Sequence, residues 1–209
     1  MGSGNKRQSV PFTGCRICRG AGRSKNRISG GDGDDCRRRP EGKEIYMTSK
    51  NVTYRQEIKQ SDIAAIKEIV SSSGFFSAAE IEIAIELAQD KLDCGHDSSY
   101  RFLFAQKEGA VAGYTCWGFI PATIGSIDLY WIAVHKDSRG SGLGKQLLAE
   151  TEKLIRQAGG RQIYAETSSR GQYLPTRRFY EVCGYQQGAF LQDFYAPGDG
   201  KIIFVKTIK

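Results

Sequence analysis

A glycine-rich hexapeptide near the middle of the chain constrains the fold more than any other feature. It reads Arg-Gly-Ser-Gly-Leu-Gly and spans residues 139–144. The apolar run before it, 129–134, is typical of a buried strand, and the run after it, 145–157, has helical spacing. A glycine turn between a strand and a helix directs free main-chain N–H groups outward, where they suit phosphate oxygens. The sequence therefore predicts a strand–loop–helix unit that binds a phosphate compound.

Two common phosphate-binding loops do not fit this spacing. A P-loop needs Gly-Lys followed by Ser or Thr, but Gly144-Lys145 is followed by Gln146, and Arg139 stands where the first glycine belongs. The dinucleotide fingerprint needs a glycine at the position of Lys145. What is left is the pattern R-x-x-G-x-G between a strand and a helix.

Strand-like and helix-like patterns alternate on both sides of the loop. Ser77 with Glu80 three residues later forms a capping-box signature at the start of one helix. The expected helices span 61–70, 77–92, 143–157 and 176–183, and the expected strands span 52–58, 100–106, 111–119, 127–134, 162–167, 185–195 and 202–207. This order predicts an α/β (α+β) fold, with a mixed central sheet of about seven strands and about four helices.

The leading segment differs in composition from the rest of the chain. Residues 1–45 carry 11 Lys and Arg against 5 Asp and Glu, a net charge of +6, whereas residues 46–209 carry 19 against 18, a net charge of +1. The leading segment has few large apolar residues, so burial cannot offset the entropy lost on ordering. We expect residues 1–46 to be a basic, disordered extension, vector-derived or upstream of a natural start at Met47, and residues 47–209 to be one domain.

The sequence contains no secretory signal and no run of 18 apolar residues, so we expect a cytoplasmic protein that does not span a membrane. The six cysteines are then expected to be reduced thiols. Cys15, Cys18 and Cys36 are reminiscent of a zinc knuckle, but a fourth ligand is absent nearby and no histidine precedes His96. No metal site is expected.

A second motif lies about 36 residues beyond the loop. The segment Phe179–Tyr185 reads Phe-Tyr-Glu-Val-Cys-Gly-Tyr. With the glycine loop and the order of elements, it resembles the GNAT superfamily of acyl-CoA N-acyltransferases over residues 48–209. The runs Glu166–Ser169 and Asp193–Gly198 resemble a bacterial subgroup without an assigned substrate. The resemblance implies a GNAT fold whose fourth and fifth strands splay around acetyl-CoA.

The resemblance also implies a binding site for acetyl-CoA as co-substrate. Main-chain groups of the fourth expected strand would pair with the pantetheine amides, and the loop N–H groups would hold the pyrophosphate. The side chain of Arg139 would add a charge-assisted bond or would simply be solvated, and Lys145 would assist or lie exposed on the helix. The implied cofactor-binding residues are Ile132, Ala133, Val134, Arg139, Gly140, Ser141, Gly142, Leu143, Gly144 and Lys145.

In many members of the family, a tyrosine in the helix after the fifth strand protonates the departing thiolate. Tyr180 has that position here, so the resemblance implies that it is the general acid; the alternative is that its ring only packs on the sheet. One departure is that Tyr173 stands where many members have an asparagine that helps to hold the cofactor. The substrate wall is expected to be formed by Phe75, Phe76 and the second helix, with the loop at 195–200, by positional analogy with the family.

The attacking amine also needs a base. We expect Glu166, on the fifth strand, to serve, because burial near the reaction centre would raise its pKa. Asp128 and Asp193 are other candidates, and a chain of waters could replace them all. Glu166 could instead pair with an arginine. His135 is expected to be a loop residue.

The sequence thus predicts transfer of an acetyl group from acetyl-CoA to a primary amine of a small molecule or a protein. Two other functions stay open: a GNAT-fold sensor that binds acyl-CoA without catalysis, and a nucleic-acid-binding protein that uses its basic extension. The extension has Phe12 as its only aromatic residue before Tyr46, so it lacks the interleaved rings of single-strand binders, and nucleic acid is not the expected partner. A homodimer is left open.

Overall fold

The computed structural model describes residues 46–47 and 52–208. The expected disordered extension therefore lies outside the described residues, except for Tyr46. The strands are β1 (Tyr46–Met47), β2 (Val52–Arg55), β3 (Arg101–Lys107), β4 (Ala110–Phe119), β5 (Ser126–Val134), β6 (Gln162–Ser168), β7 (Gln186–Ala196) and β8 (Asp199–Thr207). The helices are α1 (Asp62–Ser72), α2 (Ala78–Cys94), α3 (Leu143–Gln157) and α4 (Leu174–Val182), with short 3₁₀ turns η1 (Gly95–Asp97), η2 (Lys136–Ser138) and η3 (Gly171–Tyr173).

All eight described strands belong to one sheet, in the order β1-β2-β3-β4-β5-β6-β8-β7. Neighbouring strands are antiparallel except β5 and β6, which are parallel. The mixed sheet with four helices confirms the predicted fold class. The one addition is the two-residue β1, so the expected fourth and fifth strands are β5 and β6.

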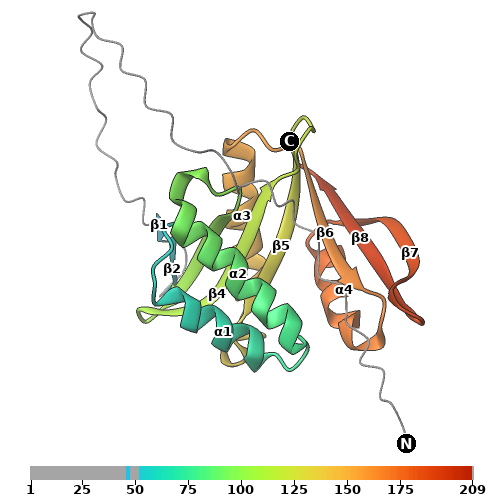
Figure 1. Cartoon of the computed structure of the whole chain (residues 1–209), viewed down its shortest axis with the longest axis horizontal. Helices are drawn as coiled ribbons and strands as arrows, with labels where there is room; N and C mark the ends of the chain where they lie inside the picture. Colours follow the sequence, from blue (N-terminus) through green and yellow to red (C-terminus); the bar gives the residue numbers. More distant parts are fainter. Residues whose placement is uncertain (1–45, 48–51, 209) are drawn as a thin grey trace, which may run out of the picture. The chain divides into compact units, whose positions relative to one another are not determined.

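Helices cover the two faces of the sheet in pairs (Figure 1). Alternating side chains of β3 show how: Phe102 and Phe104 pack with buried residues of α1 and α2, whereas Leu103 and Ala105 pack with the start of α3. Helix α4 joins α3 on the second face, where Tyr180 belongs to the same core cluster as residues of β5, β6 and β8. The expected capping box of α2 is present, with the Ser77 side chain and the Glu80 carboxylate each bonded to the other residue's main chain.

Strands β5 and β6 separate part of the way along their length. Their register of paired residues runs from Ser126 with Gln162 to Leu129 with Ala165 and then stops, although both strands continue (Figure 1). On the other side of β5, the pairing with β4 skips Tyr130, which is therefore a bulge residue. A bulge bends its strand and increases the local twist. The predicted splay is confirmed, and the bulge lies where it begins.

Candidate functional site

The glycine loop leads from the end of β5 into α3, as the sequence predicts. Gly140 and Gly142 have φ angles of +73° and +83°, in the left-handed region. Gly142 is the N-cap of α3, and no side chain caps this helix end. The N–H groups of the first turn are thus not covered by a capping side chain. They lie at the positive end of the helix dipole, which attracts anions.

Two glycines of this loop differ in what the backbone requires of them. A Cβ at Gly142 would meet no atom within 4 Å, so the φ angle is what requires glycine there. At Gly144 a Cβ would lie 3.5 Å from the Phe179 ring and 3.7 Å from a methyl group of Val134, which is ordinary contact.

Replacement of Gly142 by alanine is expected to lower the free energy of unfolding by about 1–2 kcal/mol, because a non-glycine residue must then adopt the left-handed conformation. Urea denaturation measures this change. Gly171→Ala is the matched control, since a Cβ there also meets nothing within 4 Å and its φ angle is not in the left-handed region. Equal stability of the two variants would contradict the conformational explanation.

Arg139 lies exposed at the start of the loop and makes two contacts. Its Nε donates a hydrogen bond to the Val134 carbonyl at 3.1 Å, and its guanidinium lies 5.8 Å from the centre of the Phe75 ring. Ser141 uses its hydroxyl within the loop, donating to the Ser138 carbonyl at 2.7 Å. Lys145 is exposed on α3, which agrees with the alternative that it is a surface residue.

The three β5 residues predicted to bind the cofactor lie beyond the last pair with β6. Ile132, Ala133 and Val134 pair with β4 on one side, and their side chains pack into the cores on the two faces of the sheet. Their main-chain edge toward β6 is not part of the β5–β6 ladder, which ends at Leu129. An extended amide chain can form hydrogen bonds with such an edge.

Tyr180 lies in α4 and is only 4% exposed. Its ring centre lies 5.4 Å from that of Tyr185 and 5.4 Å from that of Phe204. Burial raises the pKa of its phenol well above the ordinary value, so the group stays protonated. Both ideas about this residue are compatible with its position: the ring packs on the sheet, and the hydroxyl keeps a proton that it can donate.

Tyr173, where many relatives have asparagine, joins two distant parts of the chain. Its hydroxyl donates a hydrogen bond to the Phe75 carbonyl at 3.2 Å, and the two ring centres are 6.3 Å apart. The loop between α1 and α2 is thereby tied to η3, which follows β6. The next residue, Phe76, packs edge-on against Trp131 of β5 at 4.9 Å. Apart from the departure at position 173, no sequence pattern predicts this link.

A group of charged side chains lies on β5, β6 and β8. Ile127, Leu129, Ala165 and Ile202 belong to the core beneath α3 and α4. Strand alternation therefore places Asp128, Glu166 and Lys201 on the opposite face. The core beneath α1 and α2 includes residues of β3, β4 and β5 but, among the described residues, none of β6 or β8. We call these three residues, with Phe194 and Tyr195, the open-face cluster.

Within the open-face cluster, Lys201 forms an ion pair with Glu166, with Nζ 2.7 Å from Oε2. The same Nζ lies 3.8 Å from the centre of the Phe194 ring and 5.8 Å from that of Tyr195. Burial and the Glu166 carboxylate raise the pKa of Asp128 from 3.8 to about 6, with Lys201 opposing the increase. Burial and the carboxylates of Glu166 and Asp199 raise the pKa of Tyr195. Asp128 is thus poised to exchange a proton near neutral pH.

The remaining candidate bases have structural contacts elsewhere. Asp193, with a φ angle of +52°, accepts a hydrogen bond from the Gly198 N–H at 2.7 Å in the β7–β8 hairpin. His135 accepts one from the Asp137 N–H in η2. The prediction that His135 is a loop residue is confirmed.

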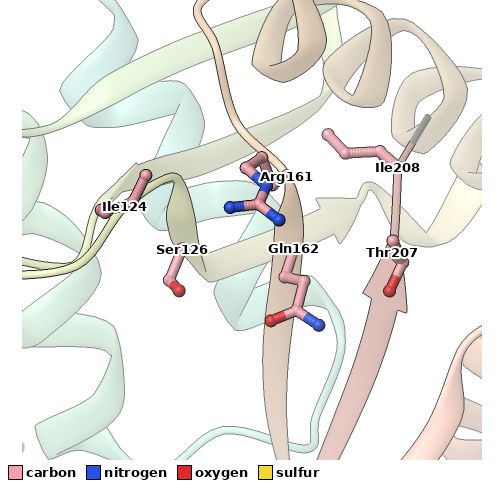
Figure 2. A pocket seen from close by; sticks show the side chains of 6 residues that line it. All are labelled: Ile124, Ser126, Arg161, Gln162, Thr207 and Ile208. Atoms are coloured by element: carbon pink, nitrogen blue, oxygen red, sulfur yellow. The ribbon is translucent and has the colours of Figure 1, made fainter.

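A shallow hollow of about 320 Å³ lies elsewhere on the sheet. Figure 2 shows its lining, in which Ser126 and Gln162 are the first residues of β5 and β6. These two residues form the pair furthest from the splay, so the hollow lies at the closed end of the two strands. Its position separates it from the glycine loop and from the open-face cluster.

The described residues contain neither a cluster suited to a metal ion nor a helix suited to a membrane. No group of three or more His, Cys, Asp or Glu side chains within 46–47 and 52–208 is arranged to hold a metal ion. No helix in that part of the chain is long and apolar enough to cross a bilayer. Cys15, Cys18 and Cys36 lie outside the described residues.

Comparison with known proteins reveals a family and a set of similar folds. A family model described as the acetyltransferase (GNAT) family matches residues 64–185. A structure assigned to the GNAT family, from Desulfovibrio desulfuricans, is 43% identical, with 76% of this chain and 99% of that chain covered and a TM-score of 0.74. No protein of curated function matches the chain.

Two more distant structures support the fold alone. The YncA protein of Salmonella typhimurium, solved with acetyl-CoA, is 20% identical, with 77% of this chain and 95% of that chain covered and a TM-score of 0.60. The ribosomal-protein-S18-alanine N-acetyltransferase of Escherichia coli is 18% identical, with 76% and 94% covered and a TM-score of 0.61.

Proposed function

The chain belongs to the acetyltransferase (GNAT) family of acyl-CoA-dependent N-acyltransferases, and on that premise we propose that it transfers an acetyl group from acetyl-CoA to a primary amine. One observation carries the proposal: the β5–β6 ladder stops at Leu129 and Ala165, and a glycine loop with an uncapped helix follows β5. A solved structure of similar fold, YncA, contains acetyl-CoA.

The residues of this chain fit the parts of acetyl-CoA in order. The free main-chain edge of 132–134 suits the pantetheine amides, and the first-turn N–H groups of α3 suit the pyrophosphate. Arg139 contacts the main chain of this edge at the Val134 carbonyl. We propose that its guanidinium leaves the Val134 carbonyl when acetyl-CoA binds and contacts the pyrophosphate instead. The carbonyl can then accept a hydrogen bond from a pantetheine amide. Acetyl-CoA is a co-substrate in this reaction, and the proposal includes no metal.

The reaction needs a base and an acid, and we assign one to each side of the splay. The acceptor ammonium gives one proton to Asp128, and the free amine attacks the thioester carbonyl. In this proposal a β5 N–H stabilises the oxyanion. As the C–S bond breaks, Tyr180 protonates the sulfur, and the second proton lost from nitrogen restores the phenol. Burial raises the pKa of Tyr180, and it raises the pKa of the CoA thiol in the same way. The phenol can therefore still protonate the departing thiolate.

Glu166 is part of the proposed catalytic pair, but in a different role from the one expected. Its carboxylate forms an ion pair with Lys201. Burial and the neighbouring Glu166 carboxylate together raise the pKa of Asp128 to about 6. We therefore propose that Asp128 accepts the proton and that Glu166 keeps it basic.

Calorimetric titration with CoA tests the proposed binding site. We expect wild-type protein to bind CoA and Arg139→Ala to bind about tenfold more weakly, because a bond to a charged group contributes about 1.5–3 kcal/mol at most. Arg156→Ala is the matched control, since it removes the same exposed charge from the other end of α3. No heat on titration of the wild-type protein would overturn the proposed function.

A further inference from the structure

One carboxylate of the open face lies outside the ion pairs of the described residues. Glu166 pairs with Lys201 at 2.7 Å, and Asp199 pairs with Arg170 at 2.8 Å. Asp128 takes part in no ion pair within the described part of the chain. Glu80, which also influences Tyr195, is engaged in the capping box of α2. The face therefore offers one position for a single positive charge.

Aromatic side chains lie close to Lys201 and to Asp128 on this face. Phe194 and Tyr195 are 50% and 40% exposed, and Lys201 lies against both rings. Phe75, on the α1–α2 loop, is 39% exposed and contacts Tyr173. Tyr130, whose pKa is raised by burial and by Asp128, provides a further ring on β5. Exposed rings of this size favour an apolar partner, because covering them stabilises the complex by about 25 cal/mol per Å².

Resting on the proposed function, we infer that the acceptor is a small monoamine with an aromatic or bulky apolar body. Its ammonium binds Asp128 at the start of the splay, and its body lies against Phe194 and Tyr195. Lys201 determines the specificity, because it neutralises Glu166 and so leaves no second site for a cation. The acetyl transfer and its proton balance are those given above.

Other classes of amine fit the same face less well. A polyamine or an aminoglycoside carries several positive charges, and only Asp128 is placed to pair with one of them, because Glu166 already pairs with Lys201. An α-amino acid would bring its carboxylate within a few ångströms of Asp128 and Glu166, whose negative charges repel it. Lys201 offers little compensation, because it is only 7% exposed and already paired with Glu166.

The test is CoA release from acetyl-CoA by the full chain with a panel of amines. The panel contains 2-phenylethylamine, spermidine, kanamycin, L-phenylalanine and a short peptide with a free amino terminus. We expect kcat/KM for 2-phenylethylamine to exceed that for every other amine by about tenfold or more, the scale of discrimination by an apolar pocket. A higher value for spermidine, kanamycin, the amino acid or the peptide would overturn the inference.

Two variants test the roles of charge and ring separately. Lys201→Met leaves Glu166 without its cation, so we expect the kcat/KM ratio of 1,4-diaminobutane to butylamine to rise about tenfold. Phe194→Ala is expected to lower kcat/KM for 2-phenylethylamine about tenfold while butylamine changes little. Phe190→Ala is the matched control: this ring is also 50% exposed on β7, but it pairs with Ile202, whose side chain lies on the opposite face. If Lys201→Met does not fold, Phe194→Ala and Phe190→Ala still test the site. Equal effects of these two variants on kcat/KM for 2-phenylethylamine would refute the assigned site.

Failure of the acceptor class can be told apart from failure of the proposed function. If some amine releases CoA but the order of preference differs, the transferase function holds and the acceptor class is wrong. If CoA binds and no amine in the panel releases it from acetyl-CoA, both fail. Calorimetric titration of the CoA complex with 2-phenylethylamine adds a readout without turnover, in which no heat contradicts the acceptor site.

Discussion

Replacement of Asp128 by asparagine is expected to lower kcat/KM for the amine by about 10²–10⁴-fold, the usual contribution of a general base. Asparagine has nearly the same shape but cannot take a proton from the acceptor. The wild-type kcat/KM should fall as pH decreases below about 6, where Asp128 becomes protonated, and this acidic limb should be absent from the variant. A steady-state pH profile of CoA release measures both effects.

The same substitution is expected to stabilise the protein at pH 8. The pKa of Asp128 is raised on folding, so its unfavourable contribution is absent below its ordinary value of 3.8, grows as pH rises to about 6, and is complete above that. Asparagine removes this contribution, and we expect a gain of about 1–2 kcal/mol at pH 8, reduced for solvent exposure, and none at pH 4. Asp193→Asn is the control, because asparagine tolerates its left-handed φ and can still accept the Gly198 bond. Undiminished activity of the Asp128 variant would exclude this base.

Replacement of Tyr180 by phenylalanine is expected to lower kcat by about 10²-fold or more while leaving the affinity for CoA unchanged. The change removes only the hydroxyl, so the ring can keep its contacts with Tyr185 and Phe204. Loss of kcat with an unchanged CoA dissociation constant indicates a group that acts in the transition state. Stopped-flow measurement of CoA release, with calorimetry for binding, separates the two.

Tyr185→Phe is the matched control for that experiment. Its ring lies 5.4 Å from Tyr180 in the same core, and it is also nearly fully buried. We expect its kcat to stay within a few-fold of wild type. If the Tyr180 and Tyr185 variants are equally active, Tyr180 only packs on the sheet, which is the alternative that the sequence left open.

Features that depend on neighbours in the chain could be predicted from the sequence. Periodicity located the strands and helices, and the spacing of Ser77 and Glu80 located the start of α2. Boundaries were less accurate. Helix α4 begins at Leu174, two residues before the expected start at 176, because proline is accepted in the first turn of a helix. Strand β1 was not predicted, because two residues have no periodic pattern; Tyr46 falls in the expected extension and Met47 in the expected domain.

Contacts between distant residues could not be predicted in this way. Tyr173 and Phe75 are 98 positions apart, and Lys201 meets Glu166 only because β8 lies next to β6 in the sheet. Such contacts depend on strand order and register, and no local pattern in a single sequence determines either of them. The strand pattern identifies Glu166 as a candidate base but does not identify its partner Lys201, and the ion pair between them is visible only in the structure.

The contact between Phe76 and Trp131 gives the protein an optical reporter of its own. Trp131 is half-buried on the stretch of β5 beyond its last pair with β6, and the edge-on ring of Phe76 connects it to the α1–α2 loop. Trp117, the only other tryptophan of the chain, is buried in the core beneath α3 and α4 and contributes a steady background. The fluorescence of Trp131 should therefore change when a ligand binds where β5 and β6 separate. The rate of binding can then be measured without an attached dye.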